Sequence, residues 1–210
     1  MRPWVRSNFN ALGYQRIAIL ASGSGSNAEE IMRYFEGHEE ARVVWVGCNK
    51  PPERAEIYQR TKRMGLSTVH FTSEDLRDGR LQIHLMEQEI DWVVLAGFLL
   101  KVPEPFIRSF RGQVVNIHPA LLPAFGGVGM FGKRVHEAVL EARAATTGIS
   151  IHWVTEVYDA GDVIFQASCS VDAGDDVDSV AEKVRKLEHQ YYPRVIEGLV
   201  SKGVRPKGKS

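Results

Sequence analysis

Short apolar runs alternate with amphipathic segments along the first 118 residues. The apolar runs have the length of strands, and they lie at 16–21, 42–48, 67–71, 92–96 and 114–118. The segments between them predict helices over 28–37, 54–64, 81–89 and 103–110. Gly65 fits a helix C-terminus and Pro103 fits a first helical turn. Strands separated by single helices form right-handed βαβ units, so this half predicts a parallel sheet covered on both faces.

The pattern changes after residue 119. The segment PALLPAFGGVGMFG is rich in proline and glycine, and a helix is expected over 133–142. Two β-rich runs at 148–154 and 163–169 flank the turn-like Asp159-Ala160-Gly161, which predicts a hairpin, and a last helix is expected over 177–200. We predict one doubly wound α/β domain over 16–200, with a mainly parallel sheet that ends in an antiparallel C-terminal hairpin. An N-terminal extension (1–15) precedes it and a basic tail (201–210) follows it.

The amino-acid composition argues against several classes of binding partner. Lys and Arg (26) balance Asp and Glu (26), which argues against a broad surface for nucleic acid or anionic lipid. The longest apolar run, 92–100, is far shorter than the roughly 20 residues of a membrane span, and the N-terminus has no apolar core of a secretory signal. The two cysteines, Cys48 and Cys169, lie far apart in strand-like runs, so we expect reduced thiols and a cytoplasmic location.

The glycine-rich stretch LASGSGSNAEE at 20–30 follows the first predicted strand and has three interpretations. Gly23, Gly25 and Ala28 match the G-x-G-x-x-A pattern of dinucleotide sites. That pattern requires an acidic residue at the end of the second strand, where this chain has Cys-Asn-Lys at 48–50.

The other two interpretations of this stretch need no dinucleotide. Backbone N–H groups near Gly25, with the side chains of Ser24, Ser26 and Asn27, suit a single phosphate at a helix N-terminus. A plain turn, with Asn27 as N-cap and Glu30 completing a capping box, fits equally well. The loop by itself leaves the choice open.

A polar pair ends the fifth predicted strand. Asn116 and His118 are two residues apart, so their side chains share one face of the strand. They lie at the carboxyl edge of the sheet, where the glycine-rich loop also lies and where α/β proteins bind ligands. A buried amide and imidazole need partners or a chemical role. Asp159 and Asp162 are candidate carboxylates, and their spacing does not separate them.

Five motifs, in order, resemble the phosphoribosylglycinamide formyltransferase family: ASGSGSN, VLAGF, NIHPALLP, GISIHWVTEVYDAGDVIFQ and KLEHQYYP. The resemblance spans about 16–200. It implies a doubly wound formyltransferase fold. It also implies transfer of a formyl group from 10-formyltetrahydrofolate to the amine of glycinamide ribonucleotide, in de novo purine biosynthesis. The products are formylglycinamide ribonucleotide and tetrahydrofolate.

The resemblance also implies a role for particular residues. The catalytic residues are Asn116, His118 and Asp159. The nucleotide is bound by Gly25, Ser26 and Asn27 at the phosphate, with Arg185 adding charge there, and by Glu188 at the ribose hydroxyls. The folate is bound by Leu95, Phe98, Leu100, Lys101 and Val102, although many relatives carry Arg at the position of Leu100.

The sequence supports several further expectations. The segment 124–133 is expected to act as a mobile lid, and His152 to support the site rather than react. No metal site is signalled, because HEAVL at His136 lacks the second histidine of H-E-x-x-H. We expect small-molecule substrates, no nucleic acid or membrane partner, and a monomer or homodimer. The alternatives are a formyltetrahydrofolate hydrolase, which uses similar residues, and a non-catalytic nucleotide-binding module.

Overall fold

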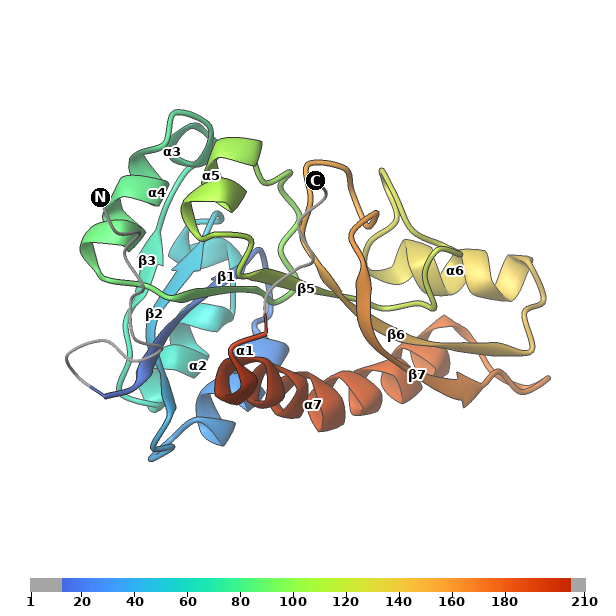
Figure 1. Cartoon of the computed structure of the whole chain (residues 1–210). Helices are drawn as coiled ribbons and strands as arrows, with labels where there is room; N and C mark the ends of the chain where they lie inside the picture. The colour runs from blue at the N-terminus through green and yellow to red at the C-terminus, as the bar shows by residue number, and fades with distance from the viewer. Residues whose placement is uncertain (1–12, 205–210) are drawn as a thin grey trace.

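The computed structural model describes residues 13–204, and a mixed sheet forms its centre (Figure 1). Within these residues the sheet has seven strands in the order β3-β2-β1-β4-β5-β6-β7. Strands β1 to β5 pair in parallel, whereas β6 pairs antiparallel with both β5 and β7. The strands are β1 (Gln15–Ala21), β2 (Ala41–Cys48), β3 (Thr68–His70), β4 (Trp92–Leu95), β5 (Val114–His118), β6 (Thr146–Trp153) and β7 (Val163–Ser170). The predicted mainly parallel sheet with an antiparallel C-terminal hairpin is therefore confirmed.

The helices follow the predicted order with two differences. They are α1 (Ser26–Tyr34), the 3₁₀ turn η1 (Pro52–Arg54), α2 (Ile57–Arg63), α3 (Ser73–Arg77), α4 (Arg80–Glu87), α5 (Glu104–Ser109), α6 (Lys133–Glu141) and α7 (Val177–Lys202). The helix expected over 54–64 is interrupted because Ala55 is extended (φ −148°, ψ 126°). Helix α3 was not predicted; a capping box between Thr72 and Asp75 begins it.

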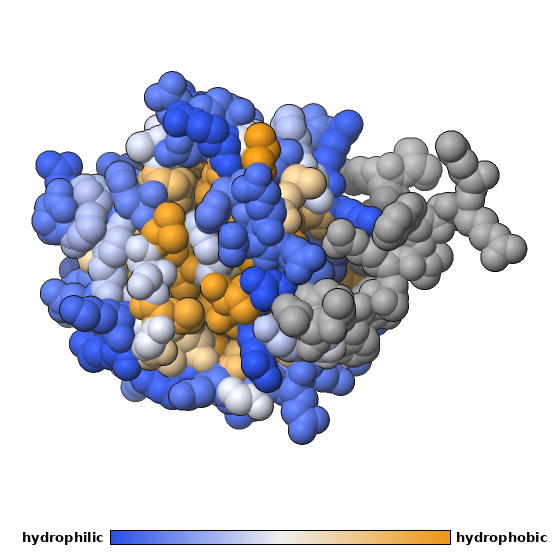
Figure 2. Space-filling view, turned by 90° about the vertical axis from the view of Figure 1, so that its left-hand side faces the viewer, coloured by the Kyte–Doolittle hydropathy of each residue, from blue (hydrophilic) through white to orange (hydrophobic). Residues whose placement is uncertain are grey.

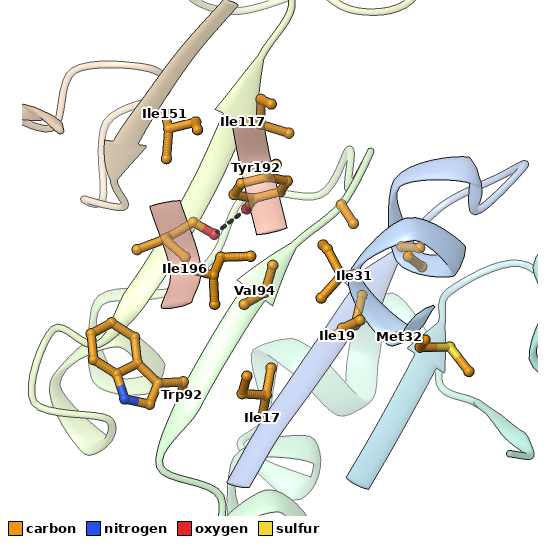
Figure 3. Close-up of a cluster of buried hydrophobic side chains, with 14 of the residues drawn as sticks. Ile17, Ile19, Ile31, Met32, Trp92, Val94, Ile117, Ile151, Tyr192 and Ile196 are labelled. Atoms are coloured by element: carbon orange, nitrogen blue, oxygen red, sulfur yellow. Dashed lines mark hydrogen bonds between the residues drawn. The ribbon is translucent and has the colours of Figure 1, made fainter. Parts of the chain in front are cut away.

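The sheet separates two apolar cores. Fully buried residues of β1 alternate between its faces: Ile17 and Ile19 pack with α1 and α7, whereas Ala18 and Leu20 pack with α4 and α5. Figure 3 shows Ile17 and Ile19 on the same side as side chains of α1 and α7. Successive side chains of a strand point to opposite faces of the sheet. Because successive residues of β1 are apolar, both faces of the sheet are apolar, and helices cover each of them.

The order of strands reverses between β1 and β4, and the loops that follow these two strands are tied together. The Ser22 N–H donates to the Gly97 carbonyl at 3.0 Å, and the Leu99 N–H donates to Ser22 Oγ at 3.0 Å. Such a switch point leaves a crevice at the carboxyl ends of the strands, which is where ligands bind in this architecture.

Two residues that were expected to mark helix ends, Gly65 and Pro103, lie at helix ends. Gly65 follows the α2 C-cap in the left-handed region (φ +75°), and its N–H donates to the Lys62 carbonyl at 3.1 Å. Pro103 is the N-cap of α5 rather than a residue of its first turn. Strand β1 begins one residue before the predicted domain, and α7 ends two residues after it. Most of the proposed extension (1–12) and tail (205–210) lies outside the described residues.

Some large apolar side chains are exposed on the surface, outside the cleft described below. Figure 2 shows a face of the molecule on which apolar side chains gather between polar ones. Val69 of β3 and Ile83 and Met86 of α4 are exposed large apolar residues, and none of them lines the cleft described below. Cys48 and Cys169 are both free thiols. Among the helices of residues 13–204, none combines the length and apolar character needed to cross a membrane.

Candidate active site

A cleft of about 690 Å³ opens at the carboxyl ends of β1, β4 and β5. Its walls come from the glycine-rich loop, the segment 95–102 after β4, the end of β5, the segment 127–133, the loop between β6 and β7, and α7. The cleft is lined by all thirteen residues to which the family resemblance assigns a catalytic or binding role: Gly25, Ser26, Asn27, Leu95, Phe98, Leu100, Lys101, Val102, Asn116, His118, Asp159, Arg185 and Glu188. The structure thus brings them together, and their individual roles remain predictions.

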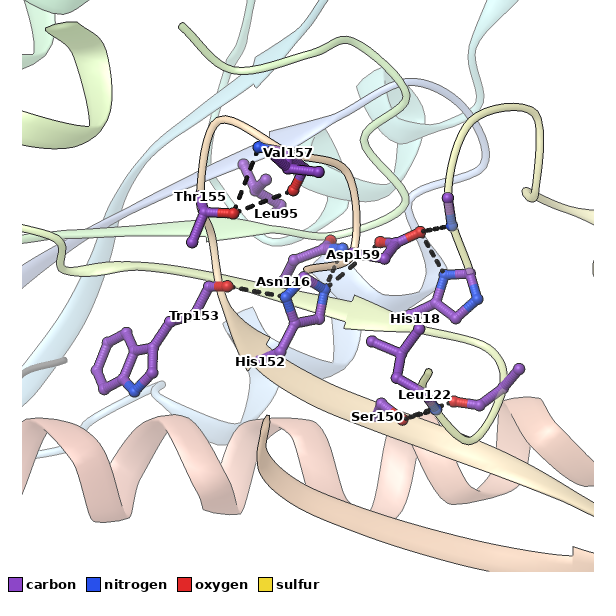
Figure 4. A network of polar contacts seen from close by, with 12 residues as sticks. Leu95, Asn116, His118, Leu122, Ser150, His152, Trp153, Thr155, Val157 and Asp159 are labelled. Atoms are coloured by element: carbon purple, nitrogen blue, oxygen red, sulfur yellow. Dashed lines mark hydrogen bonds and ion pairs between the residues drawn. The ribbon is translucent and has the colours of Figure 1, made fainter. Parts of the chain in front are cut away.

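The polar pair of β5 meets Asp159, which comes from the loop between β6 and β7 (Figure 4). His118 Nδ1 lies 3.4 Å from Asp159 Oδ2, and their side chains are only 4% and 10% exposed. Asp159 reaches this position from a left-handed backbone conformation (φ +53°), which is uncommon for a residue other than glycine. The competing candidate, Asp162, is exposed, and its contact with Trp153 is through its backbone carbonyl.

Burial and charge act in opposite directions on this pair. Burial lowers the pKa of His118, and the charge of Asp159 with the Phe125 carbonyl offsets this only in part. Burial raises the pKa of Asp159, but neighbouring groups, among them the charge of His118 and the Gly127 N–H, outweigh it, so the pKa stays below its ordinary value. Asp159 is therefore ionised, and the imidazole of His118 binds an extra proton only weakly.

His152 orients the amide of Asn116. The two residues are directly opposite each other in the β5–β6 ladder. His152 Nδ1 lies 2.8 Å from the Trp153 carbonyl, which accepts only, so Nδ1 carries the hydrogen. In the neutral ring, Nε2 then accepts from Asn116 Nδ2 at 3.1 Å. This contact leaves the second amide hydrogen of Asn116 available to a ligand, and it is the contact through which His152 would support the site.

The glycine-rich loop ends at the N-terminus of α1. Gly25 is the N-cap (φ +75°), and a Cβ there would lie 2.6 Å from Ile57 Cγ1, so only glycine fits. The first helical hydrogen bond runs from the Glu29 N–H to the Gly25 carbonyl, which leaves the preceding N–H groups outside the helical ladder. The N–H groups of Ser26 and Asn27 are thus at the positive end of the helix, beside the cleft.

The interpretation of this loop as a plain turn capped by Asn27 is wrong. Asn27 is the second residue of α1, and Nδ2 of its side chain donates to Glu188 Oε2 at 3.0 Å instead of capping the helix. Glu30 pairs with Arg33. Asn27 Oδ1 is buried and has no hydrogen-bond partner among the described residues. A buried acceptor without a donor, in the wall of a cleft, suits a ligand that carries hydroxyl or amide hydrogens.

Two residues of α7 lie across from this loop. Burial raises the pKa of Glu188 to about 7, because the hydrogen bond from Asn27 and the charge of Arg185 do not offset the loss of water. Arg185, one turn earlier, is 53% exposed and forms an ion pair with Glu182 of the same helix. Glu188 is therefore built into the wall of the cleft, whereas Arg185 lies at its rim with part of its charge already matched.

The segment after β4 supplies an apolar wall. Leu95 and Val102 are buried at 4% exposure each, and the Phe98 ring packs against Phe71 with centroids 6.0 Å apart. Lys101 is exposed and lines the same part of the cleft. Within residues 13–204, no group of three or more His, Cys, Asp or Glu side chains is arranged to hold a metal ion. A flat apolar wall beside a cation suits an aromatic ligand that carries negative charge.

Sequence reasoning missed contacts made by the backbone. The Phe125 carbonyl lies 2.8 Å from His118 Nε2, and the Gly127 N–H donates to Asp159 Oδ2 at 2.9 Å. Both groups belong to the segment expected to be a lid, and no side-chain pattern signals them. His136 of α6 also lines the cleft, and its Nδ1 is buried without a hydrogen-bond partner among the described residues.

Comparisons with known proteins find relatives that match most of the chain. The model of the formyl transferase family matches residues 15–196. The phosphoribosylglycinamide formyltransferase of Bacillus subtilis (strain 168) is 30% identical, over 89% of this chain and 95% of that protein. The chloroplastic phosphoribosylglycinamide formyltransferase of Arabidopsis thaliana is 34% identical, over 91% of this chain and 67% of that protein.

The solved structures lead to the same conclusion. The crystal structure of phosphoribosylglycinamide formyltransferase from Bacillus halodurans superposes with a TM-score of 0.80 at 32% identity. It covers 90% of this chain, and this chain covers 97% of it. The match in sequence and the match in fold therefore extend over the same, nearly complete, length. The chain belongs to the formyl transferase family.

Proposed function

We propose that the protein transfers a formyl group from 10-formyltetrahydrofolate to the amine of glycinamide ribonucleotide. The products are formylglycinamide ribonucleotide and tetrahydrofolate, and the reaction serves purine biosynthesis. The observation that carries the proposal is the convergence of Asn116, His118 and Asp159 in one cleft whose other end is the open N-terminus of α1. Two relatives that are named phosphoribosylglycinamide formyltransferase match this chain over most of their length. We also propose small-molecule partners only and a cytoplasmic location.

The ribonucleotide occupies the end of the cleft formed by α1 and α7 in this proposal. Its single phosphate accepts from the N–H groups of Gly25, Ser26 and Asn27, where the helix dipole favours an anion. Arg185 adds positive charge at the rim. The ribose hydroxyls donate to the Glu188 carboxylate and to Asn27 Oδ1, which supports the assignment because that oxygen otherwise has no donor among the described residues.

The formyl-folate occupies the wall after β4. Its pterin packs against the side chains of Leu95, Phe98 and Val102, and the backbone at Leu100 meets the polar edge of the ring. Lys101 lies at the exposed end of this wall, where the glutamate tail of the folate carries its carboxylates. Site volumes of about 300–1,000 Å³ are typical of small ligands, and the cleft falls in this range.

The chemistry is acyl transfer through a tetrahedral intermediate. The ribonucleotide amine attacks the formyl carbon, a C–N bond forms, and the electron pair of the C=O bond moves to the oxygen. Asn116 donates an amide hydrogen to this oxyanion and protonated His118 donates a second, charged hydrogen bond. The oxyanion adds a second negative charge near His118, besides that of Asp159, so the imidazolium is favoured when the intermediate forms.

Collapse of the intermediate requires one proton to move. The attacking nitrogen loses a proton, the bond between the formyl carbon and N10 breaks, and N10 of tetrahydrofolate gains a proton. Asp159 is ionised and lies beside His118, so it accepts the amine proton, directly or through one water, and it stabilises the charged imidazole. The cycle consumes no net proton.

A rate assay with paired substrates tests the proposal. The purified protein is mixed with 10-formyltetrahydrofolate, with and without glycinamide ribonucleotide, and the folate absorbance is followed. We expect turnover that requires the ribonucleotide and collapses in His118→Ala, but persists in His70→Ala, which changes an exposed histidine of β3. Turnover without ribonucleotide means a hydrolase. Folded protein without turnover in either mixture means a nucleotide-binding module.

A further inference from the structure

The segment 120–125 follows β5 and returns to the histidine that ends this strand. The Phe125 carbonyl lies 2.8 Å from His118 Nε2. A carbonyl only accepts, so Nε2 carries a hydrogen whenever this contact exists. Phe125 holds the position from the left-handed region (φ +55°), a conformation that costs free energy for a phenylalanine and persists only where surrounding contacts impose it.

The hydrogen on Nε2 determines whether the other ring nitrogen of His118, Nδ1, carries a hydrogen in the neutral ring. His118 Nδ1 faces Asp159 Oδ2 at 3.4 Å, which is longer than a normal hydrogen bond, so it is not committed to that partner. The neutral ring with its hydrogen on Nδ1 would direct the lone pair of Nε2 at the Phe125 carbonyl oxygen, two acceptors facing each other. The geometry therefore excludes this tautomer. The proton that His118 gains and loses on titration is therefore bound at Nδ1.

Ser150 holds the segment in place from β6. It is fully buried and lies directly opposite His118 in the β5–β6 ladder. Its hydroxyl donates to the Ala120 carbonyl at 2.7 Å and accepts from the Leu122 N–H at 2.8 Å. One hydroxyl thus satisfies two backbone groups of the segment just after the catalytic strand (Figure 4).

Gln166 of β7 completes the anchor. Its Nε2 donates to Ser150 Oγ at 2.8 Å and to the Leu122 carbonyl at 3.0 Å. The amide orientation is fixed, because its oxygen in that place would face the Leu122 carbonyl oxygen. With one hydrogen donated and two accepted, the Ser150 hydroxyl is saturated. Gln166 is an exposed residue on an outer strand of the sheet, so packing does not explain these two contacts.

We propose that the Phe125 carbonyl fixes His118 as the Nε2–H tautomer, so that Nδ1 donates to the oxyanion, and that Ser150 and Gln166 are positioning residues that hold this carbonyl in place. The role of Nδ1 rests on the proposed formyl transfer, whereas the tautomer and its anchor do not. The step is a hydrogen bond from Nδ1–H to the oxygen that gains the electron pair, and no bond to the ring forms or breaks.

Nitrogen chemical shifts test the tautomer without any substrate. The full chain is labelled with ¹⁵N-histidine, and two-bond ¹H–¹⁵N spectra are recorded above pH 7, with His118 assigned from His118→Gln. We expect a protonated shift at Nε2 and an unprotonated shift at Nδ1. The opposite pattern, or equal mixing of the two tautomers, overturns the proposal.

Variants of the anchor test the positioning role. In Gln166→Leu, which keeps the bulk and removes both donors, we expect the His118 shifts to move toward tautomer averaging and kcat to fall roughly two- to tenfold, the effect of a lost hydrogen bond, with both KM values unchanged. Ser168→Ala, two residues along β7, is the control and leaves both readouts unchanged. Ser150→Ala has a larger effect where it folds, because two buried backbone groups lose their partner.

The outcomes separate the two claims. Wild-type shifts and kcat in Gln166→Leu overturn the positioning role. A lower kcat with wild-type shifts also overturns it, because the loss then has another cause. The Nε2–H pattern in a wild-type protein that transfers no formyl group overturns the proposed function and the role of Nδ1, and leaves the tautomer standing.

Discussion

Replacing Asp159 with asparagine removes one charge and keeps the shape of the side chain. Its carboxylate lies 3.4 Å from His118 Nδ1, and the two side chains are 10% and 4% exposed. Coulomb's law gives about 1 kcal/mol for this pair at the dielectric constant of water and about 5 kcal/mol at an effective value of about 20. The low exposure favours the upper part of this range, so we expect the ratio of charged to neutral His118 to fall at least about tenfold in Asp159→Asn.

The negative charge of Asp159 determines in which direction the pKa of His118 changes. Asp159 raises the pKa of His118, against the larger effect of burial. Its removal lowers that pKa further, so the imidazolium needed by the oxyanion is present only at lower pH. We expect kcat to fall by at least about tenfold near pH 7. The acid side of the pH–rate profile recovers in part as the pH falls toward the new pKa of His118.

The assay combines an NMR titration of His118 Cε1 with the pH–rate profile of formyl transfer. Asp162→Asn is the control, because it removes the same charge three residues away, from an exposed side chain. The titration midpoint of His118 moves to lower pH in Asp159→Asn and stays in place in Asp162→Asn. A midpoint that is equal in wild type and Asp159→Asn refutes the electrostatic coupling, whatever the rate.

Three further predictions follow from the site. Asn116→Ala loses an oxyanion donor, and we expect single-turnover rates to fall roughly 10²–10³-fold with an unchanged fold; a loss in KM alone contradicts this. Gly25→Ala forces a Cβ to within 2.6 Å of Ile57 Cγ1, so calorimetry should show a lower melting temperature and kinetics a higher KM for the ribonucleotide than in Gly37→Ala, where a Cβ meets nothing within 4 Å. Glu188 has its pKa raised from 4.5 to about 7, so the folded state holds a proton that the unfolded state releases between these values. Wild type therefore loses about 3 kcal/mol of unfolding free energy from pH 4.5 to 7 relative to Glu188→Gln, and parallel denaturation curves would contradict the burial of this carboxyl group.

The framework of the site is predictable because it depends on local periodicity. Asn116 and His118 share a face since strand side chains alternate, and they meet the glycine-rich loop since parallel strands end at one edge. The start of α1 was misplaced for a tertiary reason. Asn27 is a good N-cap in isolation, but Glu188 of α7, distant in sequence, binds its side chain and Gly25 takes the cap.

The details of the chemistry depend on contacts that leave no periodic signal. Spacing could not separate Asp159 from Asp162, because the choice depends on a register shift in the β6–β7 pairing and on the left-handed backbone at Asp159. In the segment 125–127, His118 contacts the Phe125 carbonyl and Asp159 contacts the Gly127 N–H. These are backbone groups, so the identity of the side chains does not signal them. Helix α3 was missed because five residues are too few to show a helical period.

The fate of the formyl carbon tests the central claim most directly. The protein is given 10-formyltetrahydrofolate labelled with ¹³C in the formyl group, together with glycinamide ribonucleotide, and the reaction is followed by ¹³C NMR. Our account predicts that the label appears as a formamide on the ribonucleotide, in equal amount to the tetrahydrofolate formed. Label released as formate, or label that stays on the folate, contradicts it.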